Sequence, residues 1–249
     1  MLLIFRGILT IIHFLYSLYL AIYYCYFIIS RKCIHLSHET VSKEVDMLVR
    51  SMGKMKKLPR HLVIIVDNKD QDYFSIVRII GWCVTLGIPC ISIYQHCGLD
   101  QKKKAYVKDQ FAKSRPDLVE YVHWNDSKSS TKNGVNGTKS KIKITFLSYA
   151  DGRGEIVHLT KVLARAAQQG HLKIEEINEQ FISEKLMFKG MPDPDLAIIL
   201  GYVCSTYGLL PWHTRTTEFS TLPNHNSLSP KDFLCLLEKY NRCEQRYGK

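Results

Sequence analysis

Most short motifs that mark a nucleotide-binding or hydrolytic site are absent from this sequence. It contains no Walker loop, no Gly-x-Gly-x-x-Gly fingerprint and no Gly-x-Ser-x-Gly elbow. These absences argue against P-loop nucleotide hydrolysis, dinucleotide chemistry and the α/β-hydrolase mechanism. No helix-turn-helix, zinc-finger or RRM pattern is present either, so no nucleic-acid partner is expected despite a formal net charge of +11.

Paired cysteine motifs are also lacking. The eight cysteines are spread through the chain without any Cys-x-x-Cys. Cys83, Cys90 and Cys97 recur every seven residues and His96 precedes the last, so a metal site is conceivable there. Buried thiols in a helix and a strand of a protein from a reducing compartment are the simpler interpretation, and no metal ligands are assigned.

Charge is missing from Gly7 to Ser30, a run dense in Leu, Ile, Tyr and Phe. As a helix this run is long enough to cross about 30 Å of hydrocarbon. A cleaved signal peptide has a shorter apolar core that ends at small residues, whereas Arg31-Lys32 follows directly here. We therefore expect residues 1–30 to form an uncleaved transmembrane anchor.

The charges that flank this anchor are unequal. Arg6 alone precedes it, whereas many Lys and Arg residues follow within 31–58. The positive-inside rule then places the remainder of the chain in the cytosol. We expect 31–58 to be a juxtamembrane basic amphipathic segment that lies on the membrane or against the next domain. Its apolar stripe consists of Val41, Val45, Leu48 and Met52.

From residue 59 onward, strand-like runs alternate with helical patterns. The expected strands are 61–66, 89–94, 142–147 and 195–200, with a weaker one at 118–124. The expected helices are 73–86, 102–111, 154–169, 174–188 and 230–243. This alternation predicts an α/β domain over 59–249, with an open, mostly parallel sheet flanked by helices. Residues 126–140 are polar and predict a flexible surface loop.

Ligands of open α/β sheets bind at the carboxyl ends of strands. Asp67 directly follows the first expected strand, so its position makes it a candidate site residue. A helix N-cap or an ordinary loop carboxylate is the alternative interpretation.

The order of these segments resembles the cis-prenyltransferases, which include undecaprenyl and dehydrodolichyl diphosphate synthases. Asp151–Ile156 is similar to their Gly-Gly-Arg-x-Glu-Ile turn, and Pro192–Leu196 to their Pro-Asp-Pro-Asp-Leu strand entry. In the catalytic members, Gly-Asn-Gly-Arg follows the first strand, and an arginine with Ser-Gly-Glu-x-Arg follows the later one. Neither pattern occurs here, so by this resemblance the diphosphate-binding arginines and the Mg²⁺-associated glutamate are missing.

A narrower resemblance is to the Nogo-B receptor (Nus-type) subunits of that family, through the anchor, Leu210–Arg215 and Cys243–Lys249. It implies an accessory subunit, inactive alone, of a dehydrodolichyl diphosphate synthase at the endoplasmic reticulum membrane. The implied reaction extends farnesyl diphosphate with isopentenyl diphosphate for dolichol synthesis and protein glycosylation. The implied partners are a catalytic cis-prenyltransferase subunit that holds most of the Mg²⁺, isopentenyl and polyprenyl diphosphates, and membrane lipid.

The last residues of the sequence carry the site that this resemblance implies. Arg246 offers a bidentate guanidinium and Gly248 an unobstructed backbone amide, both suited to a phosphate. The resemblance places them in the partner's isopentenyl diphosphate site. The interface candidates are Trp212, His213, Arg215 and Glu218. Leu209–Glu218 and Phe233–Tyr240 are each expected to face a partner or the core. A membrane receptor or scaffold without an enzymatic role is the alternative function.

Overall fold

The computed structural model describes residues 2–34, 38–67, 73–125, 141–186, 190–201, 203–222 and 228–244. The chain divides into two compact units, Met1–Glu44 and Val45–Lys249. The loop expected at 126–140 lies outside the described residues, as do Arg246 and Gly248.

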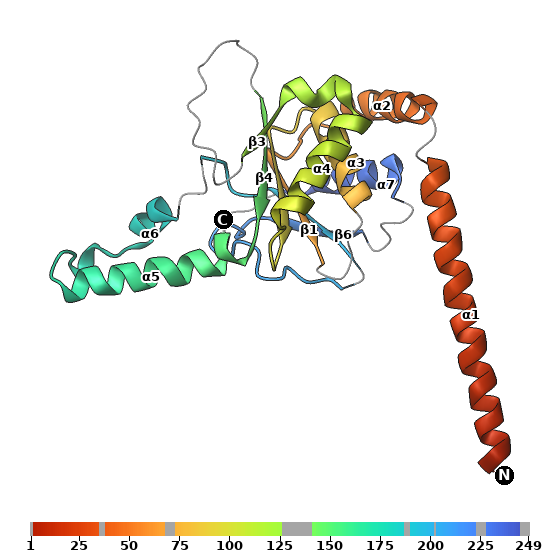
Figure 1. Ribbon diagram of the computed structural model, residues 1–249. Coiled ribbons are helices and arrows are strands. Elements are labelled where there is room, and N and C mark those ends of the chain that lie inside the picture. Colours follow the sequence, from red (N-terminus) through yellow and green to blue (C-terminus); the bar gives the residue numbers. More distant parts are fainter. Residues whose placement is uncertain are drawn as a thin grey trace. The chain divides into compact units, whose positions relative to one another are not determined.

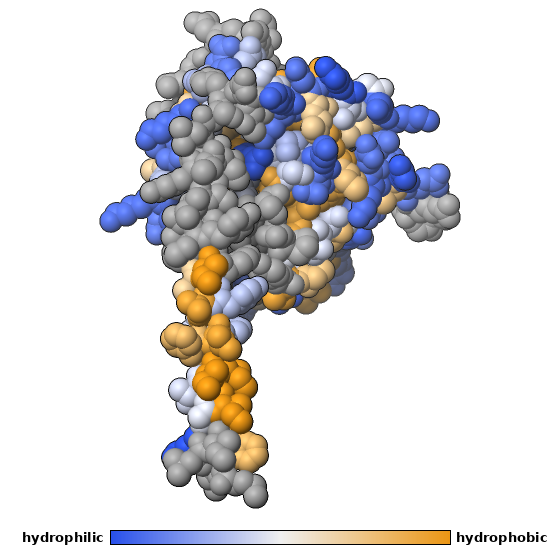
Figure 2. All heavy atoms as spheres, turned by 90° about the vertical axis from the view of Figure 1, so that its right-hand side faces the viewer, coloured by the Kyte–Doolittle hydropathy of each residue, from blue (hydrophilic) through white to orange (hydrophobic). Residues whose placement is uncertain are grey.

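The first unit contains helix α1, Leu2–Ile34. Its stretch Phe5–Ile22 is apolar, and none of that stretch is buried. Figure 2 shows the apolar side chains along this helix in orange. Within the described residues, α1 is the helix with the length and composition to cross a membrane once.

Helix α2, His38–Met52, carries the apolar stripe predicted for the juxtamembrane segment. Leu48 is fully buried in the core of the second unit, whereas Met52 is exposed. The stripe was expected to lie either on the membrane or against the next domain. At Leu48 it packs against the domain. The second unit begins at Val45 rather than after residue 58, because this contact draws the end of α2 into the domain.

Six strands form one sheet in the order β3-β4-β2-β1-β5-β6 (Figure 1). Their bounds are β1 His61–Val66, β2 Cys90–Gln95, β3 Val122–Asn125, β4 Ile142–Leu147, β5 Leu196–Leu200 and β6 Glu218–Leu222. Every pairing is parallel, which confirms the predicted fold class. All residues of β1, β2 and β5 are buried, which explains why these strands are continuous apolar runs rather than alternating patterns.

The helices of the second unit largely follow the predicted order. They are α3 Tyr73–Thr85, α4 Gln101–Ser114, α5 Arg153–Gln168, α6 Glu179–Lys185 and α7 Pro230–Arg242. Two boundaries were predicted wrongly. A 3-10 turn occupies Pro116–Tyr121, so β3 begins only at Val122. The helix expected from residue 174 begins at Glu179, because the Asn178 side chain accepts the Phe181 N–H and caps α6 there.

One face of the sheet is covered by α3, α4 and α7, which lie together on one side in Figure 1. The ring centroids of Trp82 on α3 and Phe233 on α7 are 5.4 Å apart. Phe233 and Leu237 are fully buried, and the Ser229 side chain caps α7 by accepting the Asp232 N–H. Phe233–Tyr240 was expected to face a partner or the core, and its buried face belongs to the core.

Helix α5 forms as predicted, but its apolar side has no cover within the described residues. No residue of α5 is buried, and Val162 is 44% exposed. Ile156 and Leu159 on the same side are only half-buried. In Figure 1 this helix extends away from the sheet. The periodicity of apolar residues predicted that one face of α5 packs against another surface. It does not specify whether that surface belongs to this chain or to another molecule.

The buried side chain of His61 connects the three central strands. Its Nδ1–H donates to the carbonyl of Pro192 at 2.7 Å, and its Nε2 accepts the hydroxyl of Ser92 at 2.8 Å. His61 is the first residue of β1, Ser92 lies in β2, and Pro192 precedes β5. Burial lowers the pKa of His61 to about 4, so the imidazole is neutral at physiological pH.

We predict that acid weakens the fold through His61. The ordinary pKa of this group is 6.5 and the folded pKa is lower, at about 4. Between pH 6.5 and pH 4, the His61 imidazole therefore binds a proton in the unfolded chain but stays neutral in the folded chain. The neutral His61 makes its full contribution to the free energy of unfolding above pH 6.5. That free energy decreases by about 3 kcal/mol as the pH falls to 4.

Urea unfolding of the wild type and of a His61→Asn variant between pH 4 and 7 measures this effect. The variant should lose stability at every pH but show a smaller slope against pH. Equal slopes in the two proteins would show that His61 does not titrate in this way.

Candidate functional site

The carboxyl ends of the parallel strands meet at one edge of the sheet. Asp67 directly follows β1, as its sequence position predicted, and its side chain is half-buried. A Cβ built at Gly201, directly after β5, would lie 3.9 Å from the Cβ of Asp67. The two strand ends therefore converge on this carboxylate. Its functional role stays a prediction.

Residues 205–210, here called the strap, cross this edge of the sheet. The carbonyl of Tyr207 accepts the Tyr94 hydroxyl at 2.8 Å and the His96 Nδ1–H at 2.9 Å. Tyr94 lies in β2 and His96 directly follows it. Burial raises the pKa of Tyr94 to about 12, so its hydroxyl keeps the proton that it donates.

The strap is bent by residues with left-handed backbone conformations. The φ angles are 48° at Tyr207, 78° at Gly208 and 26° at Leu210. Only glycine adopts such angles at little cost, so the two non-glycine residues carry local strain. The side chains of Leu209 and Leu210 are fully buried against the second face of the sheet, and this burial offsets the strain.

The turn after β4 is the surface on which the strap packs. Asp151 Oδ2 accepts the N–H and the hydroxyl of Ser148, at 2.9 and 3.0 Å, and so closes the turn. A Cβ at Gly152 would lie 3.1 Å from both the Gly208 carbonyl oxygen and the Leu210 nitrogen. Glycine at 152 therefore permits direct backbone contact between the turn and the strap.

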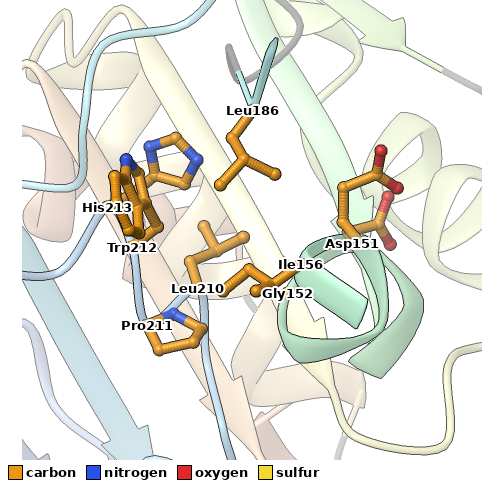
Figure 3. A pocket seen from close by; sticks show the side chains of 9 residues that line it. Asp151, Gly152, Ile156, Leu186, Leu210, Pro211, Trp212 and His213 are labelled. Atoms are coloured by element: carbon orange, nitrogen blue, oxygen red, sulfur yellow. The ribbon is translucent and has the colours of Figure 1, made fainter. Parts of the chain in front are cut away.

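A small pocket lies beside this contact. Its lining residues are Asp151, Gly152, Glu155, Ile156, Leu186, Leu210, Pro211, Trp212 and His213. In Figure 3, Trp212 and His213 lie on one side of the pocket and Asp151 on the other, with Leu186 and Leu210 between them.

The four predicted interface residues make contacts inside their own chain. The Trp212 indole N–H donates to Ser183 Oγ of α6 at 3.0 Å, and Arg215 forms an ion pair with Glu179 of the same helix. His213 Nδ1 lies 2.9 Å from an oxygen of Asp193. Glu218 begins β6. The contacts of Trp212 and Arg215 link this segment to α6, and a role toward a partner stays a prediction for all four residues.

The Pro192–Leu196 motif lies at the opposite edge of the sheet, where β5 begins. Asp195 Oδ2 accepts the backbone N–H groups of Arg60 and His61, at 2.7 and 3.2 Å. The Pro194 carbonyl accepts the Thr217 hydroxyl at 2.7 Å. The motif therefore joins the amino ends of three strands and has a structural role. This hydrogen-bonding network could not be predicted from local patterns, because its members are far apart along the chain.

The carboxyl edge is poor in groups that could hold a diphosphate or a metal. Residues 201–214 contain no Lys or Arg. Among the described residues, no group of three or more His, Cys, Asp or Glu side chains could hold a metal ion. Cys83 is buried with a raised pKa and Cys97 is exposed, so the spaced cysteines do not form a site. Arg153, at the start of α5, does lie against this edge: a Cβ built at Gly208 would be 3.4 Å from its side chain, and its charge acts on the Tyr94 hydroxyl.

Comparison with known proteins agrees with this architecture. The model of the putative undecaprenyl diphosphate synthase family matches residues 107–248. The human dehydrodolichyl diphosphate synthase complex subunit NUS1 is 30% identical over 206 residues, which cover 78% of this chain and 68% of that protein. The mouse subunit Nus1 is 32% identical over 206 residues, covering 78% and 67%.

A solved structure gives the same fold. Lavandulyl diphosphate synthase from Lavandula x intermedia superposes with a TM-score of 0.57 at 16% identity, covering 77% of this chain and 98% of that one. A parallel sheet in this order, the matched family model and the two mammalian relatives lead to one conclusion. The chain belongs to the undecaprenyl diphosphate synthase family, the cis-prenyltransferases.

Proposed function

We propose that this chain is the accessory, activity-essential subunit of a heteromeric dehydrodolichyl diphosphate synthase. The observation that carries this proposal is its similarity, over 78% of the chain, to human and mouse proteins named as subunits of that complex. The complex extends farnesyl diphosphate with isopentenyl diphosphate in cis and so supplies dolichol for protein glycosylation.

The carboxyl edge of the sheet supports an accessory rather than an independent role. Prenyl transfer releases a diphosphate, whose developing negative charge needs preorganised cations. Residues 201–214 supply none, Arg153 beside Gly208 supplies one, and the strap packs its backbone against the turn at Gly152. A catalytic cis-prenyltransferase subunit must therefore provide the main diphosphate site, including the carboxylates that hold Mg²⁺. Within the part of the chain that the structure describes, no group of three or more His, Cys, Asp or Glu side chains could hold that ion.

The Arg246-x-Gly248 segment is the part of this chain that we assign to the shared site. An arginine fork matches the oxygens of a diphosphate, and a glycine lets its backbone N–H approach them closely. The family match extends to residue 248 and so includes both positions. In this proposal, Arg246 and Gly248 bind isopentenyl diphosphate in the partner's active site.

The uncovered side of α5 supports association with another protein. On this side Val162 is 44% exposed, and Ile156 and Leu159 are only half-buried, on a helix without a buried residue. Monomeric soluble proteins rarely leave contiguous apolar surface open, and such surface commonly marks an interface. We assign this side of α5 to the contact with the catalytic subunit, next to Trp212 and the small pocket.

We predict that activity requires both subunits. The purified chain should form almost no long-chain polyprenyl diphosphate, and co-expression with a catalytic cis-prenyltransferase subunit should restore synthesis. The measurement is incorporation of labelled isopentenyl diphosphate into long-chain product, in the presence of farnesyl diphosphate and Mg²⁺. Strong synthesis by this chain alone would contradict the proposal, and no stimulation of the catalytic subunit would favour the receptor or scaffold alternative.

We predict that Arg246→Ala lowers turnover of the complex by about 10²-fold while leaving subunit association intact, because one charge-assisted diphosphate contact is lost. Arg246→Lys should recover only part of the activity, since an ammonium cannot bind two oxygens in parallel. Arg242→Ala is the matched control, because Arg242 is an exposed residue of the last turn of α7. Equal kinetics for Arg246→Ala and the wild type would exclude the shared-site role.

We propose an endoplasmic reticulum location with the second unit in the cytosol, because Arg31-Lys32 follows the apolar part of α1 and only Arg6 precedes it. Protease added to sealed microsomes should degrade the second unit without detergent. An antibody epitope placed after residue 249 provides the readout, and a lumenal protein provides the control for sealing. Protection of the epitope until detergent is added would reverse the proposed orientation.

A further inference from the structure

The end of α7 is bound to the linker that connects α2 with β1. Asn241 Oδ1 accepts the backbone N–H groups of Lys56 and Lys57, at 3.0 and 2.8 Å. The Lys57 ammonium donates to the carbonyl of Cys243 at 3.1 Å. We call these four residues the clamp. They join positions 184 to 186 residues apart in the sequence.

The side-chain oxygen of Asn241 uses both of its acceptor positions in the clamp. An amide oxygen has two lone pairs, and that of Asn241 receives two donors from consecutive residues. The Lys57 Nζ also lies 4.4 Å from the centroid of the Tyr240 ring, in cation–π range. A cation at this place also complements the carbonyl groups at the carboxyl end of a helix. The lysine is therefore held by a carbonyl and a ring face together.

The clamp fixes the place where the chain leaves the domain. Tyr240 is 3% exposed in the core, and Cys243 has an extended backbone that ends α7. The path of the chain after residue 243 therefore begins at a point held on one side by the core and on the other by the linker. The hydrogen bonds of the clamp involve no residue assigned to the sheet edge that carries Asp67, so the proposed site there does not account for them.

Distance makes this exit point important for Arg246. Arg246 is three positions after Cys243 in the sequence, so even a fully extended backbone between them spans at most about 10 Å. Such a short segment cannot compensate for a shifted origin. If the origin were loose, the binding-competent position of Arg246 would be populated for a smaller fraction of the time, and apparent affinity would fall by that fraction.

We propose that Asn241 and Lys57 are positioning residues for the Arg246-x-Gly248 segment. The clamp holds the exit point from which Arg246 reaches the isopentenyl diphosphate bound in the partner's site. This inference rests on the proposed function, and it adds a pair of residues that act on the substrate only through that segment.

The test uses the full complex with its catalytic subunit. Asn241→Leu removes both acceptor positions at similar volume and should raise the KM for isopentenyl diphosphate about tenfold, with a smaller change in kcat. Asn241→Asp keeps an acceptor oxygen and should restore a KM close to that of the wild type. Lys57→Met should raise the KM by a smaller factor. Lys56→Met is the matched control, because the Lys56 side chain is exposed and its backbone N–H is retained.

A double-mutant cycle with Arg246→Ala separates this role from a general loss of structure. If the clamp acts through Arg246, Asn241→Leu should have little further effect on KM in the Arg246→Ala complex. Additive effects would overturn the proposal, as would unchanged KM values for Asn241→Leu and Lys57→Met. Should Asn241→Leu fail to fold, the comparison of Lys57→Met with Lys56→Met decides. Normal kinetics for Arg246→Ala would instead overturn the proposed function itself.

Discussion

The fold depends on one buried, neutral imidazole. His61 is the first residue of the central strand and uses both ring nitrogens, one toward Pro192 and one toward Ser92. This arrangement requires the proton on Nδ1, because a carbonyl can only accept. It aligns the starts of β1 and β5, and Asp195 reinforces the same alignment through the backbone of Arg60 and His61. The strap follows β5, so its position also depends on this alignment.

The two edges of the sheet have different roles. The amino edge is a network of hydrogen bonds around Pro192–Asp195, which sets the strand order. The carboxyl edge, where this fold class binds ligands, is instead crossed by the strap. Its Tyr207 carbonyl is held by Tyr94 of β2 and by His96, which directly follows β2. Such a chain can keep the family's architecture while the binding of substrate depends on another subunit.

Much of the fold could be predicted from local patterns. The runs that became β1, β2 and β5 are apolar at nearly every position because both of their faces are buried. The helical spacing of apolar residues over 73–86 likewise identified α3. The boundary at α6 was missed because Asn178, a capping side chain, outweighed the apolar periodicity.

The candidate site was less predictable than the fold. Position alone correctly placed Asp67 at a strand end. The strap has no periodic pattern, and its course depends on Tyr94, Gly152 and burial of Leu210, which are distant in sequence. The indole partner of Trp212, Ser183, is 29 residues away and could not be inferred from spacing. A sequence therefore indicates which surfaces are apolar and need a contact more readily than it indicates which residues make that contact.

The uncovered side of α5 has a consequence for the supply of this protein in the cell. Val162 on this side is 44% exposed, and Ile156 and Leu159 are only half-buried, so an unaccompanied copy presents apolar surface to solvent. Surface of this kind favours aggregation and recognition by chaperones and proteases. We therefore expect the amount of this chain to follow the amount of the protein that covers α5, so that stoichiometry is maintained by turnover of the excess rather than by matched synthesis.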